Sequence, residues 1–127
     1  MRKILIVDDD PVVHLLYKKH LEREGFELLM ARDGTEALSV VAQTKPDLIV
    51  MDIMMPELNG FATIRKLKED EAMREVPVIV ITANVDHYAT ISKEVQFGGA
   101  AGLLTKPLSP AKLVGEVRRV LSVRSQT

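Results

Sequence analysis

The chain has 127 residues, of which 46% are hydrophobic and 28% are charged, a balance typical of one globular domain. Lysine and arginine number 17, aspartate and glutamate 18, and the net charge is −1. This small charge and an aromatic content of only 4% argue against a dedicated nucleic-acid-binding protein. The absence of cysteine excludes disulfides, thiol nucleophiles and cysteine-ligated metals.

The sequence contains no segment with the about 20 apolar residues that a membrane-spanning helix needs. The apolar run at residues 4–7 is shorter than the core of a signal peptide and ends at Asp8. We therefore expect a cytoplasmic protein that does not bind membranes.

Short apolar runs rich in β-branched residues recur along the chain. Their continuous apolar character indicates strands buried on both faces, as in a parallel sheet covered by helices. The predicted strands are Ile4–Val7, Leu28–Ala31, Leu48–Met51, Val76–Ile81 and Gly102–Thr105.

Segments with helical spacing separate these runs. The first predicted helix starts with Asp10 as N-cap and Pro11 as first residue, and Gly25 ends it. Its predicted core-facing stripe consists of Val12, Val13, Leu16 and Leu21. The other predicted helices contain residues 37–41, 61–67, 87–97 and 110–121.

This alternation predicts right-handed βαβ crossovers and a doubly wound α/β fold. No linker or repeat interrupts the alternation, so we expect one domain at residues 1–122 and a polar tail at residues 123–127.

Reactive side chains follow the ends of four predicted strands. They are Asp8 and Asp9 after the first strand, Asp52 after the third, Thr82 at the end of the fourth and Lys106 after the fifth. In doubly wound sheets, ligands bind beyond the carboxyl ends of the strands, so these groups are expected to converge.

Such a convergence predicts phosphoryl chemistry. Three carboxylates repel one another unless a cation compensates, and an oxygen-rich set without histidine or cysteine favours Mg²⁺, with Mn²⁺ as the alternative ion. A metal ion, a lysine and a hydroxyl suit the oxygens of a phosphoryl group. Asp52, alone at the end of a central strand, is the candidate nucleophile that would form an aspartyl phosphate.

Four segments together resemble the receiver domain of two-component response regulators. They are Ile4–Pro11, Asp52–Gly60, Thr82–Ala83, and Gly99–Ala100 ahead of Lys106–Pro107. The resemblance covers essentially the whole chain. It implies a flavodoxin-like sheet of five parallel strands in the order 2-1-3-4-5, flanked by five helices.

The resemblance also implies residue roles. Asp52 would accept a phosphoryl group from a sensor histidine kinase or a phosphotransfer protein. Asp9, Asp52 and the backbone carbonyl of Met54 would bind Mg²⁺, with Asp8 assisting. Thr82 would hydrogen-bond the phosphoryl group and Lys106 would pair with it.

The family also implies a switch. Pro107 would follow a cis peptide bond that fixes the approach of the lysine loop. Movement of Thr82 would rearrange the face made by the fourth helix, fifth strand and fifth helix, where a downstream effector would bind. Such a domain catalyses only its own phosphorylation and dephosphorylation and is not otherwise an enzyme.

The sequence departs from the family pattern at one switch position. Many receivers have an aromatic residue three positions before the lysine, where this chain has Leu103. Ala83 follows the threonine, and Met54 and Asn84 stand where the family tunes hydrolysis of the acyl phosphate.

Two other interpretations remain open at this point. The run Asp8–Val12 also fits the opening of haloacid-dehalogenase-like phosphatases, in which Asp8 would be the nucleophile and Asp10 the acid/base. A phosphorylation-silent interaction module on the same fold is the other alternative. His14, His20 and His87 lack metal-ligand spacing and are expected at the surface or its boundary.

Overall fold

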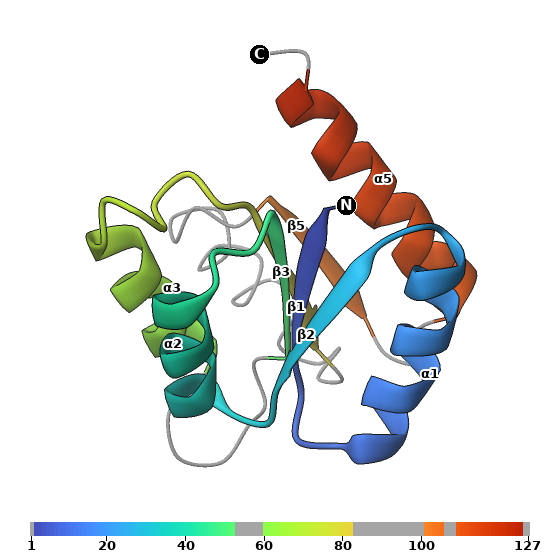
Figure 1. Ribbon diagram of the computed structural model, residues 1–127, viewed down its shortest axis with the longest axis horizontal. Coiled ribbons are helices and arrows are strands. Elements are labelled where there is room, and N and C mark those ends of the chain that lie inside the picture. The colour runs from blue at the N-terminus through green and yellow to red at the C-terminus, as the bar shows by residue number, and fades with distance from the viewer. Residues whose placement is uncertain (1, 53–59, 83–100, 106–108, 126–127) are drawn as a thin grey trace.

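A parallel sheet with helices on both faces makes up the described part of the chain (Figure 1). The structure is a computed structural model, and it describes residues 2–52, 60–82, 101–105 and 109–125. The strands are β1 (Lys3–Val7), β2 (Glu27–Ala31), β3 (Leu48–Asp52), β4 (Val78–Thr82) and β5 (Gly102–Thr105). The helices of the described residues are α1 (Pro11–Arg23), α2 (Gly34–Gln43), α3 (Gly60–Glu69) and α5 (Pro110–Ser125).

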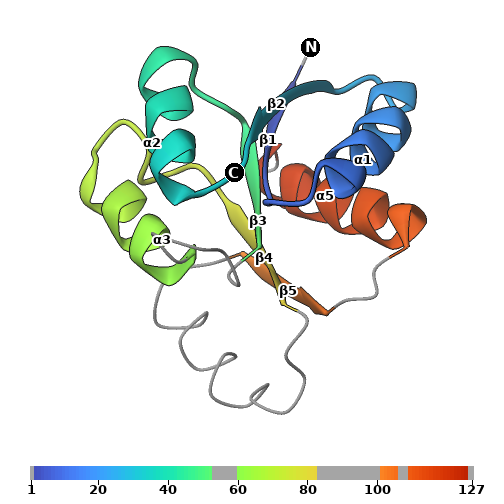
Figure 2. The same ribbon diagram turned by 90° about the horizontal axis from the view of Figure 1, so that it is seen from below.

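The sheet has the order β2-β1-β3-β4-β5 with every pair parallel. Helices α2 and α3 cover one face, and α1 and α5 cover the other (Figure 2). The predicted flavodoxin-like α/β fold is thus confirmed, and the strand order agrees with the expected one. The helix predicted within residues 87–97 lies outside the described residues.

The core consists of two clusters, one on each face of the sheet. Within β1, Leu5 and Val7 belong to the cluster under α2 and α3, whereas Ile4 and Ile6 belong to the cluster under α1 and α5. All four side chains are at most 1% exposed. Burial on both faces explains why the strand has an uninterrupted apolar sequence.

Local signals define both ends of α1. The side chain of Asp10 accepts a hydrogen bond from the amide of Val12 at 2.9 Å, and Pro11 is the first helical residue. At the other end Gly25 has a φ of 93°, and the Phe26 amide donates to the Leu21 carbonyl at 3.1 Å. The predicted start and stop of this helix are therefore confirmed.

The predicted inward stripe of α1 is wrong in part. Val12 and Leu16 are 71% and 42% exposed, whereas His14, Tyr17 and Leu21 are buried. The helix turns a histidine and a tyrosine toward the sheet, so counting only aliphatic residues gave the wrong face. The expectation that His14 lies at the surface or its boundary is corrected by the same finding, since only 8% of it is exposed.

Two predicted element boundaries also differ from the structure. Strand β4 begins at Val78 and not at Val76, because Pro77 has no amide hydrogen to donate to a neighbouring strand. Val76 is nevertheless buried, in the turn before the strand. Helix α5 continues to Ser125, past the predicted start of the tail at residue 123, because no glycine or proline follows Gly115 to end it. Within the described residues, no helix is long and apolar enough to span a bilayer.

Candidate metal centre at the carboxyl edge of the sheet

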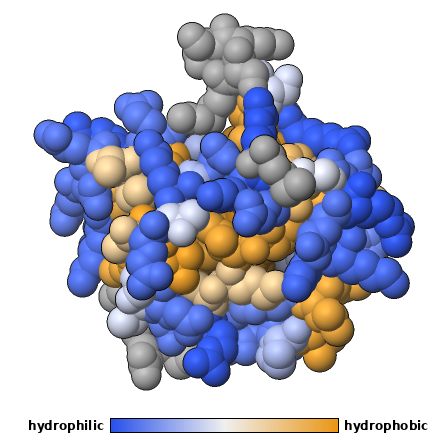
Figure 3. Space-filling model, viewed as in Figure 1, coloured by the Kyte–Doolittle hydropathy of each residue, from blue (hydrophilic) through white to orange (hydrophobic). Residues whose placement is uncertain are grey.

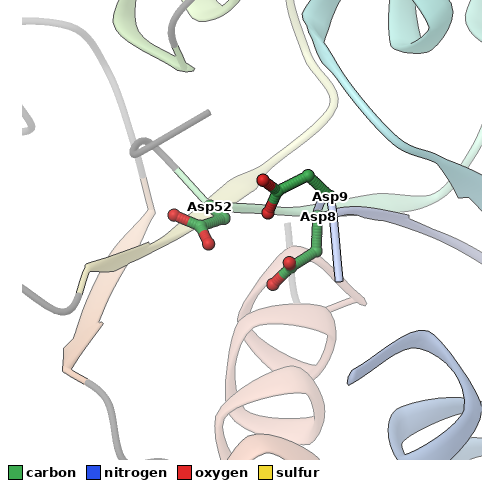
Figure 4. Close-up of side chains that lie close together, drawn as sticks. All are labelled: Asp8, Asp9 and Asp52. Atoms are coloured by element: carbon green, nitrogen blue, oxygen red, sulfur yellow. The ribbon is translucent and has the colours of Figure 1, made fainter. Parts of the chain in front are cut away.

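Asp8, Asp9 and Asp52 meet at the carboxyl edge of the sheet. Strands β1 and β3 are neighbours with Val7 opposite Met51, so the residues that follow these two lie side by side. One carboxylate oxygen from each aspartate can be chosen so that all three lie within 4.8 Å of one another. Figure 4 shows the three side chains at the ends of the two strands. The predicted convergence of these carboxylates is confirmed.

The three carboxylates differ in environment. Asp8 and Asp52 are 2% and 5% exposed, whereas Asp9 is exposed. The Asp8 Oδ1 accepts a hydrogen bond from the Asp10 amide at 2.9 Å, and the Asp8 amide donates to the Ala31 carbonyl at 3.1 Å. These bonds fix Asp8 at the floor of the site, with Asp9 at its solvent side.

The electrostatics of this cluster favour a bound cation. Two unit charges about 4 Å apart repel by roughly 4 kcal/mol at an effective dielectric constant of about 20. A divalent ion within reach of all three oxygens would offset that repulsion. Carboxylate oxygens without histidine or cysteine are the ligand set that Mg²⁺ takes in proteins, so the donor set fits the expected ion.

The backbone brings one further predicted site residue, Thr82, to this edge. Asp52 lies opposite Ile81, the residue before Thr82, and Thr82 in turn lies opposite Thr105 of β5. Thr82 and the end of β5 are therefore at the same edge as the aspartates. Leu103 lies within β5, opposite Val80.

Several other predicted site residues are not among the described residues. They are Met54, Ala83, Asn84, Lys106 and Pro107.

An exposed apolar patch beside the site was missed by the sequence prediction. Val12, Leu15 and Leu16 on α1 are 71%, 70% and 42% exposed. In Figure 3 hydrophobic side chains are visible at the lower right, where α1 begins in the same view. The sequence signal that could have revealed this patch is the helical spacing of His14, Tyr17 and Leu21. These three residues define the buried face of α1.

Comparison with known proteins identifies the family. The model of the response regulator receiver domain matches residues 4–118. The chain therefore belongs to the receiver domains of two-component response regulators.

Individual relatives agree with this assignment. The protein PilH of Pseudomonas aeruginosa is 36% identical over 122 residues, which are 96% of this chain and 99% of PilH. The DNA-binding dual master transcriptional regulator RpaA of Synechocystis is 35% identical over 95% of this chain but only 49% of its own length. The chain thus spans about half the length of the first curated relatives it matches.

A solved structure gives a relevant comparison for the acidic site. The receiver domain of the sensor histidine kinase PA1611 from Pseudomonas aeruginosa has a TM-score of 0.84 at 28% identity, covering 95% of this chain and 98% of that one. That structure has a magnesium ion coordinated in its active-site cleft.

Proposed function

We propose that this receiver domain accepts a phosphoryl group on Asp52 in a Mg²⁺-dependent reaction. The observation that carries the proposal is the convergence of Asp8, Asp9 and Asp52 within 4.8 Å at the carboxyl edge of a parallel sheet. Asp52 is the last residue of the central strand β3 and is buried, so water has restricted access to it. Receiver domains are signalling modules, and the only chemistry proposed here is formation and loss of the domain's own acyl phosphate.

The donor would be a phosphohistidine on a sensor kinase or phosphotransfer protein. An Asp52 oxygen would form the bond to phosphorus while the bond from phosphorus to the imidazole nitrogen breaks, and the imidazole would keep the electron pair. Bound Mg²⁺ would neutralise charge on the phosphoryl oxygens. Asp8, Asp9, Asp52 and the Met54 carbonyl would hold the ion, and Mn²⁺ would be able to replace it.

The remaining predicted residues would act on the phosphoryl group and the switch. Thr82 would donate a hydrogen bond to the group and Lys106 would pair with it, positioned by Pro107. Ala83 and Asn84 would flank it, and Leu103 would replace an aromatic switch residue. The effector would bind the face that includes β5 and α5.

The apolar patch of Val12, Leu15 and Leu16 supports a docking position for the donor protein. The patch begins three residues after Asp9, and a helix rises about 1.5 Å per residue, so the patch starts within one turn of the acidic site. A protein that brings its phosphohistidine to Asp52 must cover the neighbouring surface. We therefore include this patch in the donor interface and propose protein partners in the cytoplasm, with neither a membrane nor a nucleic acid as direct ligand.

The structure gives a reason to prefer Asp52 over the phosphatase alternative. That alternative needs Asp10 as acid/base, yet the Asp10 Oδ1 already caps α1 by accepting from the Val12 amide. It also gives Asp52 no role, although this residue is part of the cluster.

The test is intact-mass spectrometry after incubation with Mg²⁺ and acetyl phosphate. The wild type should gain one phosphoryl group, and Asp52→Asn should gain none. Asp10→Asn is the matched control, because asparagine is an equally good N-cap, and it should be labelled like the wild type. Labelling that survives Asp52→Asn, or that Asp10→Asn abolishes, would contradict the proposal.

A further inference from the structure

Helices α1 and α5 lie side by side on one face of the sheet (Figures 1 and 2). A groove of about 330 Å³ opens between them. One wall includes His20 and Arg23 of α1 and the following residue Glu24, and the other includes Ala111, Gly115 and Arg118 of α5. None of these residues belongs to the acidic site. The groove is therefore a separate feature of the molecule that phosphorylation of Asp52 does not explain.

Positively charged groups converge on this groove from both helices. The Arg118 guanidinium forms an ion pair with Glu24, which fixes it at the wall. The Arg23 side chain forms no ion pair or hydrogen bond with any residue that the structure describes. Two guanidinium groups against one carboxylate leave excess positive charge here, in a chain whose net charge is −1. This local excess favours an anion.

The imidazole of His20 is held in place beside these groups. Its Nδ1 lies 2.9 Å from the Leu16 carbonyl oxygen. A carbonyl can only accept a hydrogen bond, so Nδ1 carries the proton in this arrangement. This contact holds the ring of His20, which lines the groove.

The basic residues near the end of α1 have an alternative explanation, since such residues often bind the last carbonyls of a helix. Backbone amides already donate hydrogen bonds to two of the last carbonyls of α1. The Leu21 carbonyl accepts from Phe26 and the Glu22 carbonyl accepts from Gly25. Arg23 is not needed to satisfy these carbonyls.

Gly115 lies in the interior of α5, and its presence there supports a binding role for the groove. Glycine is destabilising in a helix interior relative to alanine. A Cβ at this position would meet no atom within 4 Å, and the φ of Gly115 is not positive. Neither crowding nor backbone conformation therefore requires glycine at this position, and its missing side chain keeps the floor of the groove open.

We propose that this groove binds a small organic phosphate. The phosphate would lie between Arg23 and Arg118 near His20, because a phosphate monoester has enough charge and acceptor oxygens to bridge groups on two helices. The carbon skeleton would lie over Ala111 and Gly115. The volume is at the lower end of the range of about 300–1,000 Å³ for small-molecule sites. The proposal does not depend on the function proposed for Asp52.

The test is titration of the full chain, labelled with ¹⁵N, with phenyl phosphate in the presence of a chelator that removes divalent cations from the acidic site. We expect saturable shifts of the Gly115, His20 and Arg23 amide signals, and weaker binding of inorganic phosphate, which has no carbon skeleton. Arg23→Gln should weaken phenyl phosphate binding about tenfold, the effect of one charge-assisted hydrogen bond. Gly115→Leu should abolish it by filling the floor, while α5 still forms because leucine is a good helix former.

The matched control is Arg32→Gln, which removes an exposed arginine outside the groove and should leave binding unchanged. The absence of saturable shifts would overturn the proposal. Equal weakening by Arg23→Gln and Arg32→Gln would also overturn it, because it would show general attraction to positive charge. If Gly115→Leu folds and still binds phenyl phosphate, the ligand does not occupy the groove and the proposal is wrong.

Discussion

Replacement of Asp9 by asparagine should stabilise the protein when divalent cations are absent. The three carboxylates lie within 4.8 Å of one another, and the structure describes no hydrogen bond or ion pair that would be lost with the Asp9 charge. Each repulsion at about 4 Å is worth roughly 4 kcal/mol at an effective dielectric constant of about 20. Asp9 is exposed, so water and salt screen most of this energy, and a gain of about 1 kcal/mol is expected.

The assay is thermal unfolding in a chelator and again with saturating Mg²⁺. A gain of about 1 kcal/mol corresponds to a rise in Tm of roughly 3–6 °C for a domain of this size. Mg²⁺ should then raise the Tm of the wild type more than that of Asp9→Asn, because the variant lacks one of the proposed ligands and should bind the ion more weakly.

Asp10→Asn is the control for this prediction. It removes the same charge one residue later, outside the cluster, and keeps the N-cap of α1. If Asp9→Asn and Asp10→Asn have the same Tm in the chelator and gain equally from Mg²⁺, the reasoning about the cluster is refuted.

Three further substitutions test other parts of the structure. Leu15→Glu should change the free energy of unfolding by less than about 0.5 kcal/mol, because the side chain is 70% exposed. It should slow phosphoryl transfer from a phosphohistidine protein but not from acetyl phosphate. Equal slowing with both donors would contradict the docking role of the patch. Gly25→Ala should cost about 1–2 kcal/mol in urea unfolding because φ is 93°, and an unchanged midpoint would contradict this. Gly102→Ala should cost less than about 1 kcal/mol, because the Glu116 Oε1 that would lie 2.9 Å from its Cβ is the end of a flexible side chain and can move away. Adding Glu116→Ala should recover part of any loss, and no recovery would show that the strain lies elsewhere.

The sheet could be predicted from sequence because its strands are buried on both faces. The run Ile4–Val7 is continuously apolar since alternate residues face two different clusters. Turn chemistry at Asp10, Pro11 and Gly25 defined both ends of α1. These signals are local in sequence, so they can be interpreted without knowing the tertiary structure.

Features that depend on packing were predicted less well. The buried face of α1 includes His14 and Tyr17, which an aliphatic pattern does not select, and Val12 and Leu16 are exposed instead. The apolar run predicts a start of β4 at Val76, whereas the structure places this buried residue in the preceding turn.

The acidic part of the site was predictable because topology determines it. Parallel strands end at the same edge, so residues at the carboxyl ends of β1 and β3 must be neighbours once these strands pair. The groove between α1 and α5 was not predictable in this way. It depends on how two helices distant in sequence pack, and on the side chain that α5 lacks at Gly115.

Chemical mapping of the phosphorylated residue tests the central claim most directly. After incubation with Mg²⁺ and acetyl phosphate, borohydride reduces an aspartyl phosphate to homoserine, and peptide mass spectrometry locates that residue. The proposed function predicts homoserine at position 52 alone. Homoserine at position 8, or none under conditions in which the intact protein gains a phosphoryl group, would contradict it.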